Sequence, residues 1–133
     1  MIPQQQTPQV DRQVRKVETF SAGQGRTRVV LELYEVGSDF LAVLCGGSAH
    51  IGAATLAEPT TGVPIRLTSL SSLGHREAEL TLEFSNAMTT ATGKRTLTIA
   101  GIHLDGITKL EIEAVRKAVQ ELSALAVTHA AKS

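Results

Sequence analysis

The sequence predicts an α+β fold in which a mainly antiparallel sheet of five to six strands carries two helices packed on one face. The first half of the chain holds short apolar segments separated by glycine-containing turns, which is typical of paired strands. Two later segments repeat their apolar residues with the period of a helix, and each apolar stripe needs a sheet face to cover it. The chain has 133 residues, 42% of them hydrophobic, which is enough for one core and too little for two.

The pattern predicts five strands, at residues 14–20, 27–34, 40–45, 49–57 and 95–100. The second alternates apolar and polar residues, as a half-buried strand does, and the third is continuously apolar, as expected of a central strand. Because short turns with glycine join the first four, we expect these strands to pair in sequence order as an antiparallel meander.

The helices are placed by their apolar spacing and by their ends. A possible edge strand at residues 64–73 precedes them, although its proline and serines are unfavourable for a strand. The first helix is expected between His75 and Gly93, the latter as the C-cap. Its apolar stripe consists of Leu80, Phe84, Ala87, Met88 and Ala91. The second helix begins with a capping box formed by Thr108 and Glu111. Its apolar stripe consists of Ile112, Val115, Val119, Leu122 and Ala126.

Composition argues against several classes of protein. Lys and Arg total 13, as do Asp and Glu, and the chain has no Trp, so a nucleic-acid binder is not expected. The single cysteine, Cys45, excludes an internal disulfide framework. No apolar run reaches the roughly 20 residues of a membrane span, and residues 1–13 are too polar for a signal peptide, so we expect a cytoplasmic protein. Those residues are expected to form a disordered arm before a single domain at residues 14–129.

Three histidines stand in glycine-flanked segments where a strand or helix meets a loop, which is where rigid elements hold functional side chains. If residues 49–57 form a strand, His50, Gly52 and Ala54 share one face, and their small side chains leave a volume that a ligand or a packed helix must fill. His50 is then either a polar anchor on a pocket floor or a core histidine bonded to a carbonyl. Gly46 and Gly47 form either an anion-binding concavity or, more simply, a hairpin turn.

The other two segments carry charged partners. His103 and Asp105 share a face of an extended chain, where a carboxylate can fix the tautomer of an imidazole; alternatively, Asp105 bonds its own backbone in a turn. His75, Arg76 and Glu77 open the first helix, where free N–H groups attract a phosphate or carboxylate; alternatively, they form a solvated first turn in which Glu77 favours the helix dipole. From the residues alone we expect a histidine-lined, glycine-floored pocket for an anionic ligand, without a named reaction.

The segments GGSAHIGA, GHRE and AGIHLDGIT, at residues 46–53, 74–77 and 100–108, together resemble the prenylated-flavin chaperone family. This family includes the small D subunit associated with gallate and other hydroxybenzoate decarboxylases. It is similar in fold to the proteasome-assembly chaperones, which have an antiparallel sheet with helices on one side and are usually dimeric. Arg76 stands where the family often has lysine, and Gly106 where it often has asparagine.

The resemblance implies that the chain binds reduced prenylated FMN, or FMN, and delivers it to an aromatic-acid decarboxylase without catalysing a reaction itself. A divalent metal bridging the phosphate is conceivable, and a homodimer is expected. The residues that match the family's segments, and would bind the cofactor, are Gly46, Gly47, His50, Gly52, His75, Arg76, His103 and Asp105. Two alternatives stay open: an assembly chaperone without a small ligand, and a small metal-dependent enzyme built on the histidines and Asp105.

Overall fold

The alternating pattern at the start of the chain forms three consecutive antiparallel strands: β1 (Val14–Ala22), β2 (Val29–Val36) and β3 (Asp39–Gly47). A short 3₁₀ helix, η2 (Gly25–Thr27), joins the first two. The computed structural model describes residues 13–61, 63–72 and 77–132. The expected arm falls outside these residues apart from Gln13.

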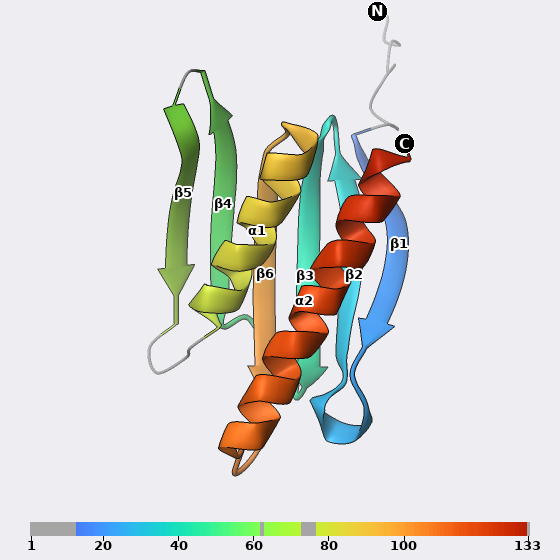
Figure 1. The fold of residues 1–133 in the computed structure, drawn as a ribbon, viewed down its shortest axis with the longest axis vertical. Helices are drawn as coiled ribbons and strands as arrows, with labels where there is room; N and C mark the ends of the chain where they lie inside the picture. Colours follow the sequence, from blue (N-terminus) through green and yellow to red (C-terminus); the bar gives the residue numbers. More distant parts are fainter. Residues whose placement is uncertain (1–12, 62, 73–76, 133) are drawn as a thin grey trace, which may run out of the picture.

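The expected four-strand meander is wrong after β3. In the described part of the chain, the remaining strands are β4 (Ala53–Thr60), β5 (Val63–Ser71) and β6 (Thr96–His103), and the sheet order is β1-β2-β3-β6-β4-β5. β6 lies between β3 and β4 and is parallel to β3, whereas all the other pairs are antiparallel (Figure 1).

The reason lies in the two glycines at the end of β3. Gly46 and Gly47 pair in register with Ile102 and His103 of β6, so they continue the strand and do not form a hairpin turn. The chain then crosses the end of β6 before β4 begins at Ala53, four residues later than the sequence pattern indicates. The possible edge strand at residues 64–73 is confirmed as β5, at one edge of the sheet.

Two helices, α1 (Ala78–Thr92) and α2 (Lys109–Ala131), cover the same face of the sheet (Figure 1). The capping box is present as expected: Thr108 accepts from the Glu111 backbone N–H, and the Glu111 side chain accepts from that of Thr108. Gly93 ends α1 with φ of 71°, a left-handed conformation that glycine adopts without steric cost. Within the described residues, neither helix has the length and apolarity needed to cross a membrane.

The core lies between the helices and β2, β3 and β6. Its largest fully buried apolar side chains are Leu31, Leu33, Leu44, Phe84, Met88 and Leu122. α1 is rotated relative to the expected stripe, because Thr81, Ser85 and Thr89 are buried against the sheet while Ala91 is exposed. Hydroxyl pairs between α1 and the strands replace part of the apolar packing that the pattern predicts.

The opposite face of the sheet carries neither helix. Alternate residues of β3 and β6, such as Leu41, Val43, Leu97 and Ile99, point away from the buried core positions and are half-buried. A sheet face of this composition is ordinarily covered by a second layer. The helix-free face is therefore a surface suited to association.

Candidate functional site

The candidate site lies at the edge of the sheet where the parallel strands β3 and β6 both end and where α1 and α2 begin (Figure 1). The loop at residues 48–52 crosses the end of β6 here. Two backbone hydrogen bonds hold it: Ser48 N–H donates to the His103 carbonyl at 3.0 Å, and Gly52 N–H donates to the Ala100 carbonyl at 2.9 Å. The loop that carries His50 is thus fixed to the strand that carries His103.

Two glycines permit this close approach. A Cβ at Gly101 would collide with the His50 carbonyl, and a Cβ at Gly47, which has φ of 60°, would collide with the His103 carbonyl. A larger residue at either position would push the loop off β6. These glycines therefore serve first to bring two segments of the chain's own backbone together.

The expectation that His50, Gly52 and Ala54 share a strand face is wrong, because β4 begins only at Ala53. Strand alternation within β4 places Ala54 on the helix-free face. Gly52 faces the start of α1 instead, where an added Cβ would lie 2.7 Å from the Glu77 carboxylate. His50 consequently lies in a loop, and its orientation depends on its neighbours.

Those neighbours engage both nitrogens of the His50 ring. Nδ1 lies 3.1 Å from the Ser48 carbonyl oxygen, and Nε2 lies 3.2 Å from Glu77 Oε2. The ring also meets the His103 ring edge-on, with centroids 6.3 Å apart and an interplanar angle of 81°. Two of the three sequence-predicted histidines, His50 and His103, therefore lie side by side.

Glu77, which the sequence places at the start of the first helix but not in the expected binding set, also belongs to the site. It occupies the N-cap position of α1 and is only 6% exposed, although its side chain forms no cap hydrogen bond. Its Oε2 accepts from the Ile102 backbone N–H at 3.1 Å in addition to its contact with His50. The sequence signal that points to Glu77 is its place in the Gly-His-Arg-Glu segment. A glutamate at a helix start is ordinarily solvated, so its burial is not expected from the sequence.

His103 Nε2 lies 3.0 Å from Asp105 Oδ1, but β6 ends at His103 and Asp105 lies in the turn that follows, so the two residues do not share a strand face. Both side chains are exposed, Asp105 almost fully. The Asp105 backbone carbonyl accepts from Arg26 Nη2 at 2.8 Å, and Arg26 also binds Glu111 through two hydrogen bonds of 2.7 and 2.9 Å. The Arg26 hydrogen bond is the main cause that lowers the pKa of the Glu111 carboxyl to about 2.

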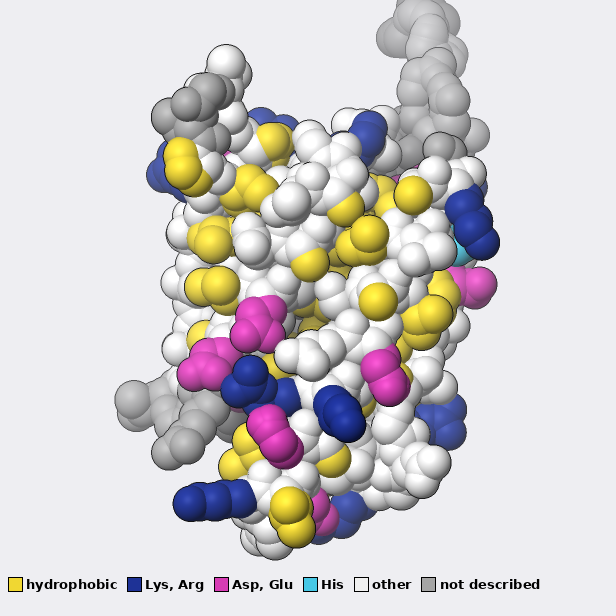
Figure 2. All heavy atoms as spheres, viewed as in Figure 1, with side chains coloured by type: hydrophobic (Ala, Val, Ile, Leu, Met, Phe, Trp, Pro, Cys, Tyr) yellow, Lys and Arg dark blue, Asp and Glu magenta, His cyan; other side chains and the backbone are white. Residues whose placement is uncertain are grey.

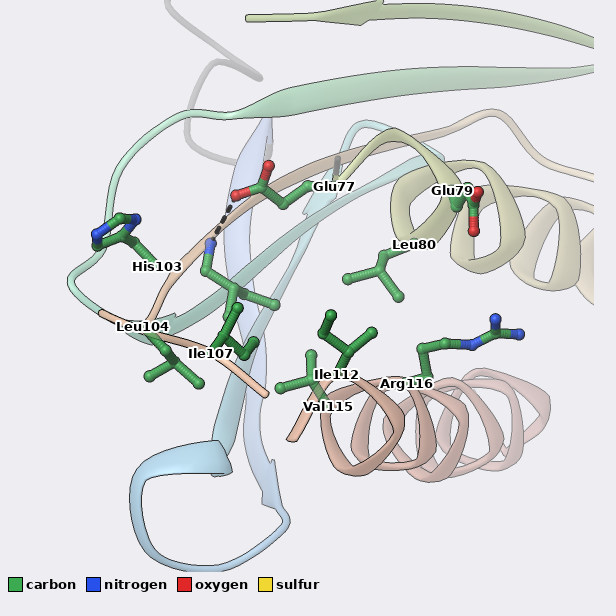
Figure 3. A pocket seen from close by; sticks show the side chains of 10 residues that line it. Glu77, Glu79, Leu80, His103, Leu104, Ile107, Ile112, Val115 and Arg116 are labelled. Atoms are coloured by element: carbon green, nitrogen blue, oxygen red, sulfur yellow. Dashed lines mark hydrogen bonds between the residues drawn. The ribbon is translucent and has the colours of Figure 1, made fainter. Parts of the chain in front are cut away.

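An apolar hollow of about 370 Å³ lies between the first turns of the helices and the end of β6 (Figure 3). Its apolar lining includes Leu80, Ile102, Ile107, Ile112 and Val115. Leu80, Ile112 and Val115 point toward one another, while His103 and Arg116 lie at opposite ends. Ile112, expected in the core stripe, is instead 40% exposed. Over the starts of α1 and α2, acidic and basic side chains lie side by side (Figure 2).

The remaining candidates are placed less centrally. Gly46 is buried, and a Cβ there would lie 3.1 Å from the Arg28 carbonyl and 3.2 Å from the Ile102 side chain. His75 and Arg76 lie outside the described residues. Among the residues that are described, no group of three His, Cys, Asp or Glu side chains could hold a metal ion.

The site's residues fit a planar ring system with a polar edge. An exposed imidazole at the end of an apolar hollow offers a hydrogen-bonding group beside a surface for a ring. The described lining of the hollow does not include Gly46, Gly47 or Gly52, and the space beside each is filled by the chain's own atoms, so the expected glycine floor is not observed.

Comparison with known proteins gives one family and a shared fold. A family model described as a prenylated flavin chaperone LpdD-like domain matches residues 23–130. A solved chaperone complex for yeast 20S proteasome assembly contains a similar chain, with a TM-score of 0.62 at 8% sequence identity, covering 89% of this chain and 98% of that one. At that identity the likeness concerns the fold alone. No curated protein matches the chain.

Proposed function

We propose, from the premise that this chain belongs to the LpdD-like prenylated flavin chaperone family, that it binds reduced prenylated FMN and passes it to an aromatic-acid decarboxylase. The family and the fold both agree with the resemblance in the sequence. A carrier needs no catalytic group of its own. It has to hold the cofactor, shield it from water and oxygen, and release it to the enzyme.

The observation that carries the proposal is the contact between His50 and His103 at the edge of an apolar hollow. When bound, the cofactor would supply the reactive ring that the decarboxylase uses. The chain's own part is to bind and orient it: the exposed His103 can hydrogen-bond a polar ring edge, and Asp105 can fix the His103 tautomer. The apolar side chains can exclude water from the ring face.

The other residues of the proposed binding set have supporting roles. Gly47 and Gly52 keep the loop close to β6 and leave room for Glu77, and Gly46 allows the backbone approach at the end of β3. His75 and Arg76 are proposed from the sequence to bind the phosphate, as a basic pair before a helix start would. Metal analysis of the loaded protein tests whether a divalent metal bridges the phosphate.

The proposed partners are a decarboxylase in the cytoplasm and a second copy of the chain. The helix-free sheet face supports association, because neither α1 nor α2, the helices of the described part of the chain, covers its half-buried apolar residues on β3 and β6. An isologous dimer would cover both copies of this face at once.

An assembly chaperone without a small ligand is the second candidate, and the same helix-free face favours it. The two readings differ in what copurifies with the protein: a flavin in the first, and a protein partner without flavin in the second. The third, a metal-dependent enzyme, requires tightly bound metal in the purified protein.

The proposal is tested by anaerobic titration of the purified chain with reduced prenylated FMN. We expect His103→Ala and His50→Ala to weaken binding by about tenfold or more, since each removes a polar contact or its support. His129→Ala, a histidine change near the end of α2 that removes a ring contact with Phe20 and no contact of the site, should leave the affinity near that of wild type. Wild-type affinity in both site variants would refute the pocket assignment.

A further inference from the structure

Glu77 is a buried acidic side chain that connects three segments of the proposed site. It belongs to the start of α1, it accepts from the backbone of Ile102 in β6 at 3.1 Å, and it contacts His50 of the crossing loop at 3.2 Å. Only 7% of its side chain is exposed, so Glu77 is not an ordinary solvent-exposed carboxylate. Burying a carboxylate is costly unless hydrogen bonds compensate it, so the position of these contacts matters.

The space for the carboxylate depends on Gly52. A Cβ at Gly52 would lie 2.7 to 2.8 Å from the Glu77 carboxylate carbon and both of its oxygens. These distances are shorter than any normal van der Waals contact of a Cβ atom. Any side chain at this position would displace the Glu77 carboxylate. The glycine and the glutamate therefore form a matched pair, one from the loop and one from the helix.

The contacts also fix the orientation of the His50 ring. Its Nδ1 faces the Ser48 carbonyl at 3.1 Å, and its Nε2 faces Glu77 Oε2 at 3.2 Å. Glu77 Oε2 also accepts from the Ile102 N–H, so one side of the His50 ring is connected to β6 and the other to its own loop. An imidazole with an oxygen beside each ring nitrogen has little freedom to rotate.

We propose that Glu77 is a positioning residue of the flavin site, which holds the His50 ring edge-on against His103 with both His50 nitrogens occupied. His50 then supports the position of His103, which lines the hollow and is the imidazole that meets the cargo. This role rests on the proposed function, but it assigns the two histidines different tasks. It also adds a residue that binds no cargo itself and acts through His50.

The test uses Glu77→Gln, which keeps the size of the side chain and an acceptor for the Ile102 N–H but removes the charge. The control is Glu83→Gln, the same change at an exposed position of α1. The first measurement is ¹⁵N NMR of histidine ring nitrogens in the cargo-free protein, with His50→Gln used to assign the His50 signals. We expect the His50 ring signals of Glu83→Gln to match those of wild type and those of Glu77→Gln to shift, because the neighbour of Nε2 changes from a carboxylate to an amide.

The second measurement is the affinity for reduced prenylated FMN under anaerobic conditions. We expect Glu77→Gln to bind the cofactor about tenfold more weakly than wild type. An effect of this size is typical when a hydrogen-bonding group behind a ligand-binding histidine is removed. Glu83→Gln should bind like wild type. If Glu77→Gln does not fold, Gly52→Ala tests the same contact, because its Cβ displaces the carboxylate while the charge remains. It should weaken binding and change the His50 signals in the same way.

The outcomes separate the two claims. Wild-type protein that binds no flavin would reject the proposed function and this role together. If wild type binds flavin, equal affinity in Glu77→Gln would overturn the positioning role alone. Weaker binding with unchanged His50 ring signals would also overturn it, because the effect would then come from charge or folding and not from the orientation of His50.

Discussion

At the scale of single residues, Arg26 and Glu111 connect the turn between β1 and β2 to the start of α2. Arg26 binds the Glu111 carboxylate through Nε and Nη2 and also donates to the Asp105 carbonyl. Glu111 in addition accepts from the Thr108 N–H at 3.0 Å as part of the capping box. One carboxylate thus caps the helix and fixes the loop that follows His103.

This pair predicts a pH dependence of stability. The folded pKa of Glu111 is about 2, below its ordinary value of 4.5, with the Arg26 hydrogen bond as the largest cause. The contribution of the ionised carboxylate is therefore complete above about pH 4.5 and is lost as the pH falls toward 2. Glu111→Gln retains a capping side chain but lacks this charge, so its melting temperature should fall less than that of wild type over this range.

Thermal melts from pH 6 to pH 2 check the prediction. Arg26→Gln should reproduce the weaker acid dependence, because it removes the main cause of the lowered pKa from the other side. Parallel melting curves for wild type and both variants would show that the pair contributes nothing to the acid response.

The sequence allows some single-residue geometry to be predicted and conceals the rest. The capping box follows from its spacing of three, whereas the contact between His103 and Asp105 forms through the turn after β6 and not on a shared strand face. The place of Glu77 does not follow, because its burial depends on Gly52 and Ile102, which are 25 residues away on either side. Such contacts arise from the fold and leave no local pattern.

At the scale of elements, α1 packs on the sheet through hydroxyl groups. Ser85 Oγ donates to the Thr55 carbonyl at 2.8 Å and lies 2.6 Å from Thr98 Oγ1, and both side chains are buried. Thr81 and Thr89 make similar contacts with β4 and β6. Every such hydroxyl must keep a partner, since an unsatisfied buried polar group is costly.

We predict that Ser85→Ala destabilises the protein by about 1–3 kcal/mol, because it leaves the Thr98 hydroxyl and the Thr55 carbonyl without this partner. Adding Thr98→Val to Ser85→Ala should cost less than the sum of the two single changes, since the pair is then removed together. Urea unfolding at equilibrium measures these free energies. The control is Thr90→Ala, an exposed change on the same helix. If Ser85→Ala lowers the free energy of unfolding no more than Thr90→Ala does, the prediction is contradicted.

The elements themselves were largely predictable. Alternation and turn residues locate β1, β2 and β3, and apolar period and caps locate both helices, because these signals are local. The buried stripe of α1 was predicted from apolar residues alone, and it is displaced because Thr and Ser on the neighbouring row find hydroxyl partners in the sheet. Hydroxyl pairing between distant segments cannot be read from one helix.

At the scale of the whole molecule, the parallel pairing of β3 with β6 creates the site. It brings Gly47 beside His103 and makes the loop with His50 cross the end of β6. The short glycine turns favour a hairpin, so the sequence pattern alone predicts the wrong neighbour for β3. The choice depends on non-local pairing, which only the complete sheet decides.

The central claim is that this chain carries prenylated flavin at the His50–His103 edge. The most direct measurement is an absorbance spectrum of the protein purified without oxygen after co-expression with a flavin prenyltransferase. The account predicts that flavin absorbance elutes with wild-type protein and is strongly reduced in His103→Ala. Wild-type protein that carries no flavin, from cells in which the prenyltransferase is shown to make the cofactor, would contradict it.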